Sequence, residues 1–149
     1  FNQLVQDMTD TLADRGGIGL AATQIGIAQR VAIISIAGGP TRYGNLQPMP
    51  LTIFVNPEIK IIDPKVNGYW EGCLSVPGMR GYVERPQHIS VHYLDGDARP
   101  QQLELSGFIA TVFQHEFDHL DGKLYVDHIQ DMSLFAYEPE FEQFIAPNP

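Results

Sequence analysis

The sequence predicts an α+β fold, and three patterns in it carry that prediction. Apolar residues at helical spacing, from Phe1 to Leu12, begin the chain. Short runs rich in β-branched residues follow, of which VAIISI at residues 31–36 is the clearest. An apolar stripe at helical spacing returns between residues 106 and 120. Short strands followed by a helix are typical of an α+β domain.

The N-terminal part of the chain is expected to contain one amphipathic helix and two loops. The helix should end near Asp14, because Gly16 and Gly17 are stop signals. Residues 17–26, GIGLAATQIG, are expected to form the first loop. Residues 38–50 are rich in glycine and proline, which predicts a second loop exposed to solvent.

Strands are expected through the middle of the chain, at residues 31–36, 52–56, 58–62, 89–94 and 101–105. Asn56-Pro57 is expected to separate the second strand from the third. Residues 69–76 should be extended. The last two strands flank the turn sequence DGDARP, which predicts a hairpin.

A second helix is expected after this hairpin. Ser106 is the expected N-cap, the helix should run to about Leu120, and Gly122 lies just beyond its end. A weaker helix is predicted over residues 132–144, where Pro139 interrupts the pattern.

Composition excludes several classes of protein. The chain has 149 residues and 44% hydrophobic content, which suits a single domain spanning residues 1–149. No apolar run is long enough to span a membrane. The formal net charge of −9 makes nucleic acid an unfavourable partner. The lone cysteine, Cys73, fits a reducing compartment, so a cytoplasmic location is expected.

The stretch QHEFDHLDG, residues 114–122, places two histidines four residues apart. On a helix, positions i and i+4 are separated by about 40°, so His115 and His119 can bind one ion. Glu116 points about 100° away from His115, beside the ion, where a proton shuttle for water is needed. This pattern predicts a catalytic metal site.

The third protein ligand has candidates on both sides of this helix. Downstream candidates are Asp127, His128, Asp131, Glu138, Glu140 and Glu142. Upstream lies Cys73, in the stretch EGCLS, and a thiolate binds a transition metal more strongly than a carboxylate does. Gly72 has no side chain, so the backbone there can approach a neighbouring group closely, which suits a crowded site.

Three motifs in this order resemble those of the peptide deformylases: GIGLAATQIG, EGCLS and QHEFDHLDG. The resemblance covers nearly the whole chain. It implies antiparallel β-sheets around a central helix carrying the HExxH motif. It also implies an enzyme that removes the formyl group from the N-terminal formyl-methionine of nascent proteins and releases formate.

The resemblance assigns roles to particular residues. The metal ligands would be Cys73, His115 and His119, with water as the fourth ligand. The metal would be one divalent ion, Fe²⁺ in the first place, with Zn²⁺, Ni²⁺ or Co²⁺ able to replace it. Glu116 would transfer the proton. The Gln24 side chain and the Leu74 backbone amide would stabilise the oxyanion.

Substrate contacts follow from the same resemblance. The peptide would bind as an added strand along the Gly19 segment. The methionine pocket would be lined by residues in or beside the motifs, namely Ile18, Tyr69, Glu71, Phe108, Val112 and the ring of His115.

Two features of this chain differ from the family pattern. Members usually carry further residues before the position of Phe1, so the N-terminal segment of the domain is expected to be missing. Many bacterial members have a basic C-terminal helix that docks on the ribosome. Residues 124–149 here contain no lysine or arginine, so tight docking by this tail is not expected. The stretch from Ser75 to Pro86 resembles the organellar branch, so an organellar or phage origin stays open.

Two other functions are compatible with parts of the sequence. An HExxH zinc metallopeptidase would take its third ligand downstream, and Cys73 would then be inert. A non-catalytic module with a structural metal would need four protein ligands, and the chain has no second cysteine.

Overall fold

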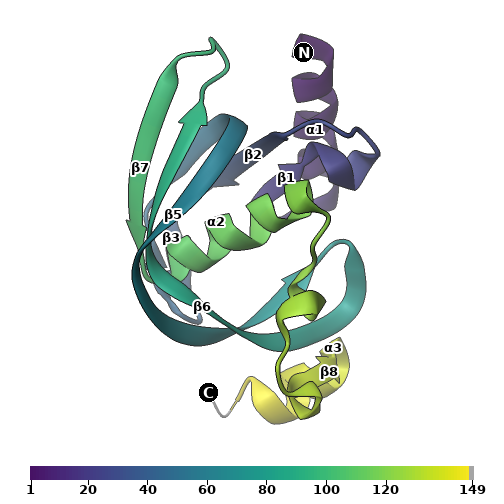
Figure 1. Ribbon diagram of the computed structural model, residues 1–149. Helices are drawn as coiled ribbons and strands as arrows, with labels where there is room; N and C mark the ends of the chain where they lie inside the picture. Colours follow the sequence, from purple (N-terminus) through teal and green to yellow (C-terminus); the bar gives the residue numbers. More distant parts are fainter. Residues whose placement is uncertain (148–149) are drawn as a thin grey trace.

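The computed structural model describes residues 1–147, in which an antiparallel sheet curves around the helix α2 (Phe108–Asp118) (Figure 1). The main sheet has six strands. Five follow the order β1 (Gly19–Ala21), β2 (Val31–Ile36), β5 (Met49–Cys73), β6 (Val76–Leu94) and β7 (Pro100–Ser106). The sixth, β8 (Phe135–Tyr137), pairs with β6. The predicted α+β class, with antiparallel strands around a central helix, is confirmed.

The first helix, α1 (Asn2–Arg15), ends one residue after the predicted position. Gly16 follows it with φ of 76°, a conformation that glycine adopts without strain. The helix buries Met8 and Leu12 in a small cluster that includes Leu20 and Ile33. This contact places α1 against the β1–β2 end of the sheet.

The two strands predicted on either side of Asn56-Pro57 are one continuous strand, β5, so the predicted break is wrong. The pairing of β5 with β6 shifts register between Val55 and Glu58, and Asn56 has a φ of 49°. A bulge accommodates a proline that cannot donate a ladder hydrogen bond. Further register shifts follow along the two long strands, and bulges of this kind bend a sheet.

Both predicted loops contain regular structure. Residues 17–26 include β1 and a 3₁₀ turn, Ala22–Ile25. Residues 38–50 include a small hairpin of β3 (Gly39–Thr41) and β4 (Gly44–Leu46), together with the start of β5. Leu46 is only 9% exposed and joins the main core, which holds the hairpin against the domain.

The predicted hairpin of β6 and β7 is confirmed, but the predicted N-cap of the second helix is wrong. Ser106 is the last residue of β7, and Gly107 occupies the N-cap position with φ of 82°. The helix α2 ends at Asp118, a 3₁₀ turn covers His119–Asp121, and Gly122 closes it in the left-handed conformation.

The helix predicted over residues 132–144 is largely replaced by other structure. A 3₁₀ turn (Met132–Leu134) and β8 come first. The helix α3 (Glu138–Glu140) and a π-helical turn (Phe141–Ile145) follow. Pro139 lies in the first turn of α3, where its missing N–H has no helical partner to lose.

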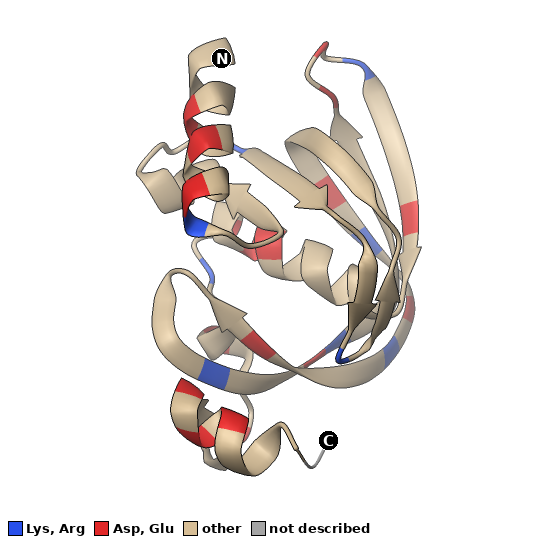
Figure 2. Ribbon diagram, turned by 180° about the vertical axis from the view of Figure 1, so that it is seen from behind, with Lys and Arg blue, Asp and Glu red and all other residues tan. Residues whose placement is uncertain are grey.

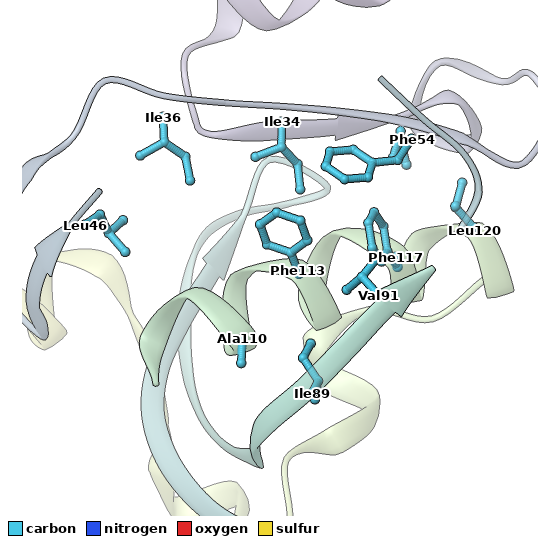
Figure 3. Packing of buried hydrophobic residues seen from close by; sticks show 12 residues of the cluster. Ile34, Ile36, Leu46, Phe54, Ile89, Val91, Ala110, Phe113, Phe117 and Leu120 are labelled. Atoms are coloured by element: carbon cyan, nitrogen blue, oxygen red, sulfur yellow. The ribbon is translucent and has the colours of Figure 1, made fainter. Parts of the chain in front are cut away.

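The main core lies between α2 and the concave face of the sheet (Figure 3). The rings of Phe113 and Phe117 lie 5.3 and 5.4 Å from the ring of Phe54. Each buried side chain of this size contributes about 1.5–3 kcal/mol. Phe113 and Phe117 precede His115 and His119 by two residues each, about 200° around the helix. The core therefore directs both histidines to the opposite face of α2.

Acidic side chains gather on α1 and on the segment around α3 (Figure 2). This distribution is consistent with the net charge of −9. None of the helices in residues 1–147 is long and apolar enough to cross a membrane.

Candidate active site

Three side chains that can bind a metal converge where the end of β5 approaches α2. Cys73 is the last residue of β5, directly before the turn formed by Leu74 and Ser75. His115 lies on α2, and His119 follows at its C-cap. One ligand atom of each of Cys73, His115 and His119 lies within 4.8 Å of the other two. A thiolate and two imidazoles form a donor set suited to Zn²⁺ or Fe²⁺.

The surroundings of Cys73 favour the thiolate, which is the form that binds a metal. Burial acts to raise its pKa, but hydrogen bonds with His115, His119 and the Ser75 amide lower it to about 5. The sulfur lies 3.5 Å from His119 Nε2. Burial alone would lower the pKa of His115, whereas its bonds to Cys73 and Glu71 raise it.

Glu71 orients the ring of His115. Its Oε1 lies 2.7 Å from His115 Nδ1, which leaves Nε2 as the ring nitrogen available to a metal. Arg85 holds the same carboxylate through Nε and Nη2 at 2.8 and 3.1 Å. Burial acts to raise the pKa of Glu71, but the bonds with His115 and Arg85 lower it overall. Arg85 also donates to Asp118 at 2.8 Å, so the network joins β5, β6 and α2.

Glu116 is buried beside this group, with 8% of its surface exposed. Its Oε2 has no hydrogen-bond partner within residues 1–147. Burial raises the pKa of this carboxyl, although the nearby charges of His115 and His119 oppose that effect. A Cβ atom added to Gly19 would lie 2.7 Å from Glu116 Cδ, so the missing side chain at Gly19 makes room for the carboxyl. A buried carboxyl without a partner is suited to proton transfer with a bound water.

Gln24 and Leu74 lie on opposite sides of Cys73 in the chain. Gln24 Oε1 accepts a hydrogen bond from the Ala21 amide at 2.9 Å, which fixes the orientation of the side-chain amide. Gln24 Nε2 donates to Ser75 Oγ at 3.0 Å and lies 3.9 Å from Cys73 Sγ. Leu74 is 49% exposed, in the turn between β5 and β6.

Comparison with known proteins identifies the family. The polypeptide deformylase family model matches residues 1–134. A peptide deformylase from Cellvibrio japonicus is 47% identical over 143 residues, 96% of this chain and 80% of that protein. One from Leptospira biflexa is 42% identical over 142 residues, 95% of this chain and 79% of that protein. The chain belongs to the polypeptide deformylase family.

A solved structure supports the same assignment. It is a Met-Ala-Ser-bound peptide deformylase of class I type b from Acinetobacter baumannii, with a TM-score of 0.74 and 39% identity. The match covers 86% of this chain and 80% of that chain. Peptide deformylases are metal-dependent enzymes that remove the N-formyl group of nascent peptides.

The deformylase motifs surround a cavity of about 330 Å³. Of the site residues expected from the sequence, all but Tyr69 line it. Tyr69 is buried, and its ring lies 5.1 Å from that of Phe108, which does line the cavity. The Tyr69 hydroxyl donates to Gln87 at 2.7 Å. Tyr69 therefore supports a wall of the cavity from outside.

Four residues at the site are not predicted by the sequence. Trp70, Arg80 and Thr111 line the cavity, and Arg85 donates a hydrogen bond to Glu71. One signal for Arg85 was present. It shares a strand face with the buried residues Gly81, Val83 and Ile89, and a charge at such a position of an alternating strand needs a partner. For Trp70 and Arg80 no local pattern distinguishes a cavity wall from an ordinary strand position.

The downstream candidates for the third ligand lie apart from the histidines. Within residues 1–147, the group able to hold a metal consists of Cys73, His115 and His119 alone. The side chains of Asp127 and Asp131 cap the turns that follow α2. His128 bonds to Asp118, and Glu138 bonds to Arg80. An HExxH peptidase with a ligand downstream of the helix does not fit this arrangement.

Proposed function

We propose that Cys73, His115 and His119 hold one divalent metal ion, Fe²⁺, in this deformylase. The observation that carries the proposal is the convergence of their ligand atoms within 4.8 Å. Two imidazoles and a thiolate also accept Zn²⁺, Ni²⁺ and Co²⁺, so these ions can replace iron. When bound there, the ion would supply Lewis-acid activation of water.

Glu116 is the proton-transfer residue in this proposal. It accepts a proton from the water whose oxygen bonds to the formyl carbon. It then delivers the proton to the leaving nitrogen as the C–N bond breaks, giving formate and a free amine. The burial of Glu116 and its raised pKa support this role, because a base should titrate near the working pH.

Gln24 and Leu74 are proposed to stabilise the oxyanion. The amide of Gln24 has two N–H groups, and Ser75 engages Nε2 through one hydrogen bond, which leaves the second for substrate. Leu74 lines the same cavity, and its backbone amide is the second proposed donor. Each such donor contributes about 3 kcal/mol to lowering the barrier.

The formylated peptide is proposed to bind along β1, with its methionine side chain in the cavity. Within residues 1–147, β1 is an end strand of the sheet and contains Gly19, so a peptide strand can be added there. The cavity walls for methionine are Ile18, Gly19, Glu71, Phe108 and Val112, with Tyr69 supporting Phe108. The relative bound to Met-Ala-Ser, a peptide with an N-terminal methionine, supports this arrangement.

The proposed partners are nascent peptide N-termini in the cytoplasm, without nucleic acid or membrane. Residues 124–147 carry acidic side chains but no lysine or arginine, and like charge opposes binding to ribosomal RNA. Tight docking of this segment on the ribosome is therefore not part of the proposal. Co-sedimentation with ribosomes at low salt, with and without residues 137–149, measures this directly.

One experiment tests the function and the metal ligands together. Protein purified without oxygen is assayed for formate release from formyl-Met-Ala-Ser, and its metal content is measured in the same sample. Cys73→Ala should lose the metal and the activity, whereas Glu140→Gln, an exposed change downstream, should keep both. Retention of metal by the Cys73 variant, or absence of formate release by the iron-loaded enzyme, would contradict the proposal.

A further inference from the structure

The segment of residues 135–145, here called the C-terminal segment, packs beside the active-site cavity. Its strand β8 pairs with Met79–Gly81 of β6, with Ala136 opposite Arg80. Figure 1 shows β8 and α3 next to β6, away from α1. The segment therefore lies next to one of the residues that line the cavity.

Two side chains of the C-terminal segment contact Arg80. Glu138 Oε1 accepts a hydrogen bond from Arg80 Nε at 3.0 Å, and both side chains are about one-third exposed. The ring of Phe141 lies 5.7 Å from Arg80 Cζ. Phe141 is 2% exposed, and its ring lies 5.3 Å from that of Trp70, another cavity residue. Arg80 is thus held by an ion pair on one atom and by an aromatic ring.

The N–H donors of Arg80 that are not bonded to Glu138 lie close to Cys73. A Cβ atom added to Gly72 would lie 3.0 Å from Arg80 Cζ and Nη1, so the guanidinium lies against the backbone next to Cys73. Within residues 1–147, its Nη1 and Nη2 atoms make no hydrogen bond. A guanidinium has five N–H donors, and four of them remain for a ligand.

A second hollow of about 450 Å³ adjoins the active-site cavity. The two share five residues, Gly17, Gly72, Cys73, Leu74 and Arg80, and Glu138 lines the second hollow only. A peptide whose formyl-methionine fills the cavity needs a path for its following residues. The adjoining hollow provides such a path, and Arg80 lies at the junction.

We propose that Glu138 and Phe141 are positioning residues, which hold Arg80 where it binds the peptide residues that follow formyl-methionine. The proposal rests on the deformylase function proposed above and adds a role for the C-terminal segment in substrate binding. The Nη groups donate to backbone carbonyl oxygens of the peptide. Because Glu138 neutralises Arg80, the wild-type enzyme should not select acidic residues at these positions.

Steady-state kinetics with two substrates test this role. Formyl-Met-Ala is too short to reach the adjoining hollow fully, whereas formyl-Met-Ala-Ser-Ala extends into it. E138Q should raise KM for the longer peptide by about two- to fivefold, the worth of a partly exposed ion pair, with kcat unchanged. Its KM for formyl-Met-Ala should change by less. E138Q should also favour formyl-Met-Ala-Asp-Ala over the serine peptide, because Arg80 is then an unpaired cation.

The matched control is E140Q, which removes the same charge two residues away from an exposed side chain of α3. It should behave as the wild type on all peptides. If Glu138 acts through Arg80, E138Q should have no further effect in an R80Q background. Thermal unfolding of E138Q checks that the fold persists.

Three results with KM as the readout would overturn the inference. They are an equal KM change for both peptide lengths in E138Q, the same change in E140Q, and additive effects of E138Q and R80Q. A fall in kcat with unchanged KM would also count against it, because it would place Glu138 in the chemical step. Absence of formate release by the wild-type enzyme is a different failure, since it overturns the proposed function itself.

Discussion

The chemistry of this site depends on how single side chains are surrounded. Glu116 is buried with an unpartnered oxygen, and its pKa is raised. Cys73 is partly buried, yet hydrogen bonds lower its pKa to about 5. The two pKa values therefore shift in opposite directions, upward for Glu116 and downward for Cys73. A carboxylate with a raised pKa is a stronger base, and a thiol with a lowered pKa supplies the thiolate that binds a metal.

Replacement of Glu116 by glutamine should separate proton transfer from metal binding. The amide has nearly the same shape but cannot accept and return a proton, so kcat should fall by about 10²- to 10⁴-fold. The metal content should not change, because Glu116 lies outside the group of ligand atoms. Metal analysis and formate release on one preparation measure both quantities. Near-normal turnover would rule out the role assigned to Glu116.

The metal-free protein should contain a reactive thiolate at Cys73. With a pKa of about 5, the thiolate fraction is already saturated at pH 6.5, so the rate of alkylation by iodoacetamide should be nearly flat up to pH 8. For an ordinary cysteine peptide, with a pKa of about 8.5, the alkylation rate should rise about tenfold for each pH unit over most of that range. Addition of Zn²⁺ should slow the alkylation of Cys73.

The variant His115→Ala serves as the control for this measurement. It removes the hydrogen bond that contributes most to lowering the pKa of Cys73. The alkylation rate of this variant should rise with pH. A steep pH dependence in the unmodified chain would show that Cys73 is mainly a thiol at neutral pH.

At the scale of elements, one buried network fixes the position of α2 relative to the long strands. Glu71 of β5, Arg85 of β6 and Asp118 of α2 are joined by charged hydrogen bonds of 2.8 to 3.1 Å. The Glu71 and Arg85 side chains are each 5% exposed. Such a network contributes little net stability relative to apolar packing, but removal of one member leaves a buried charge without its partner. Its position next to His115 indicates that it also fixes the geometry of the proposed metal site.

Glu71→Gln should weaken both the fold and the metal site. The pKa of Glu71 is lowered in the folded state, below its ordinary value of 4.5. Its stabilising contribution is thus complete above about pH 4.5 and is lost as the pH falls through the lower, folded pKa. At pH 7 the variant should lose about 3 kcal/mol of unfolding free energy and bind metal about 10- to 100-fold more weakly.

Urea unfolding of the metal-free protein at pH 7 and pH 4 measures this effect. The loss of stability on acidification should be smaller in Glu71→Gln than in the wild type. Glu140→Gln, at an exposed position, should follow the wild-type profile. Identical acid sensitivity of wild type and Glu71→Gln would show that the carboxylate of Glu71 is not stabilised in the fold.

At the scale of the whole molecule, the site connects parts of the chain that are distant in sequence. The end of β5 carries Cys73, whereas His115 and His119 belong to α2 and its C-cap. On the other face of α2, the main core joins the same helix to the sheet. A metal bound by Cys73 and the two histidines would therefore join β5 to α2, on the face of the helix opposite the hydrophobic core.

Removal of the metal should lower the thermal stability of the enzyme without unfolding it. At a free metal concentration about 1,000-fold above Kd, binding stabilises the native state by about 4 kcal/mol. For a domain of this size, that corresponds to roughly 10 °C in Tm. Scanning calorimetry of the loaded and chelated protein checks the shift. Complete unfolding on chelation would mean that the core between α2 and the sheet cannot hold the fold alone.

The sequence by itself determined the elements whose signals are local. Helical spacing predicted α1 and α2, and a run of β-branched residues predicted β2. Alternation predicted the β6–β7 hairpin, and Gly122 marked the end of α2. The HExxH spacing predicted that His115 and His119 lie close together, because one helix turn separates them regardless of the rest of the fold. Three motifs in order indicated the family.

Only the tertiary structure decided the features that depend on long-range pairing. The long strand β5 continues through Pro57 because its pairing with β6 absorbs a bulge, which local propensity does not reveal. Residues 135–137 form a strand because β6 offers them an unpaired edge beyond β7. The contact of Arg85 with Glu71 and that of Glu138 with Arg80 depend on strand register and on which faces meet. Tyr69 lies outside the cavity for the same reason, since the direction of a strand side chain is set by its partners in space.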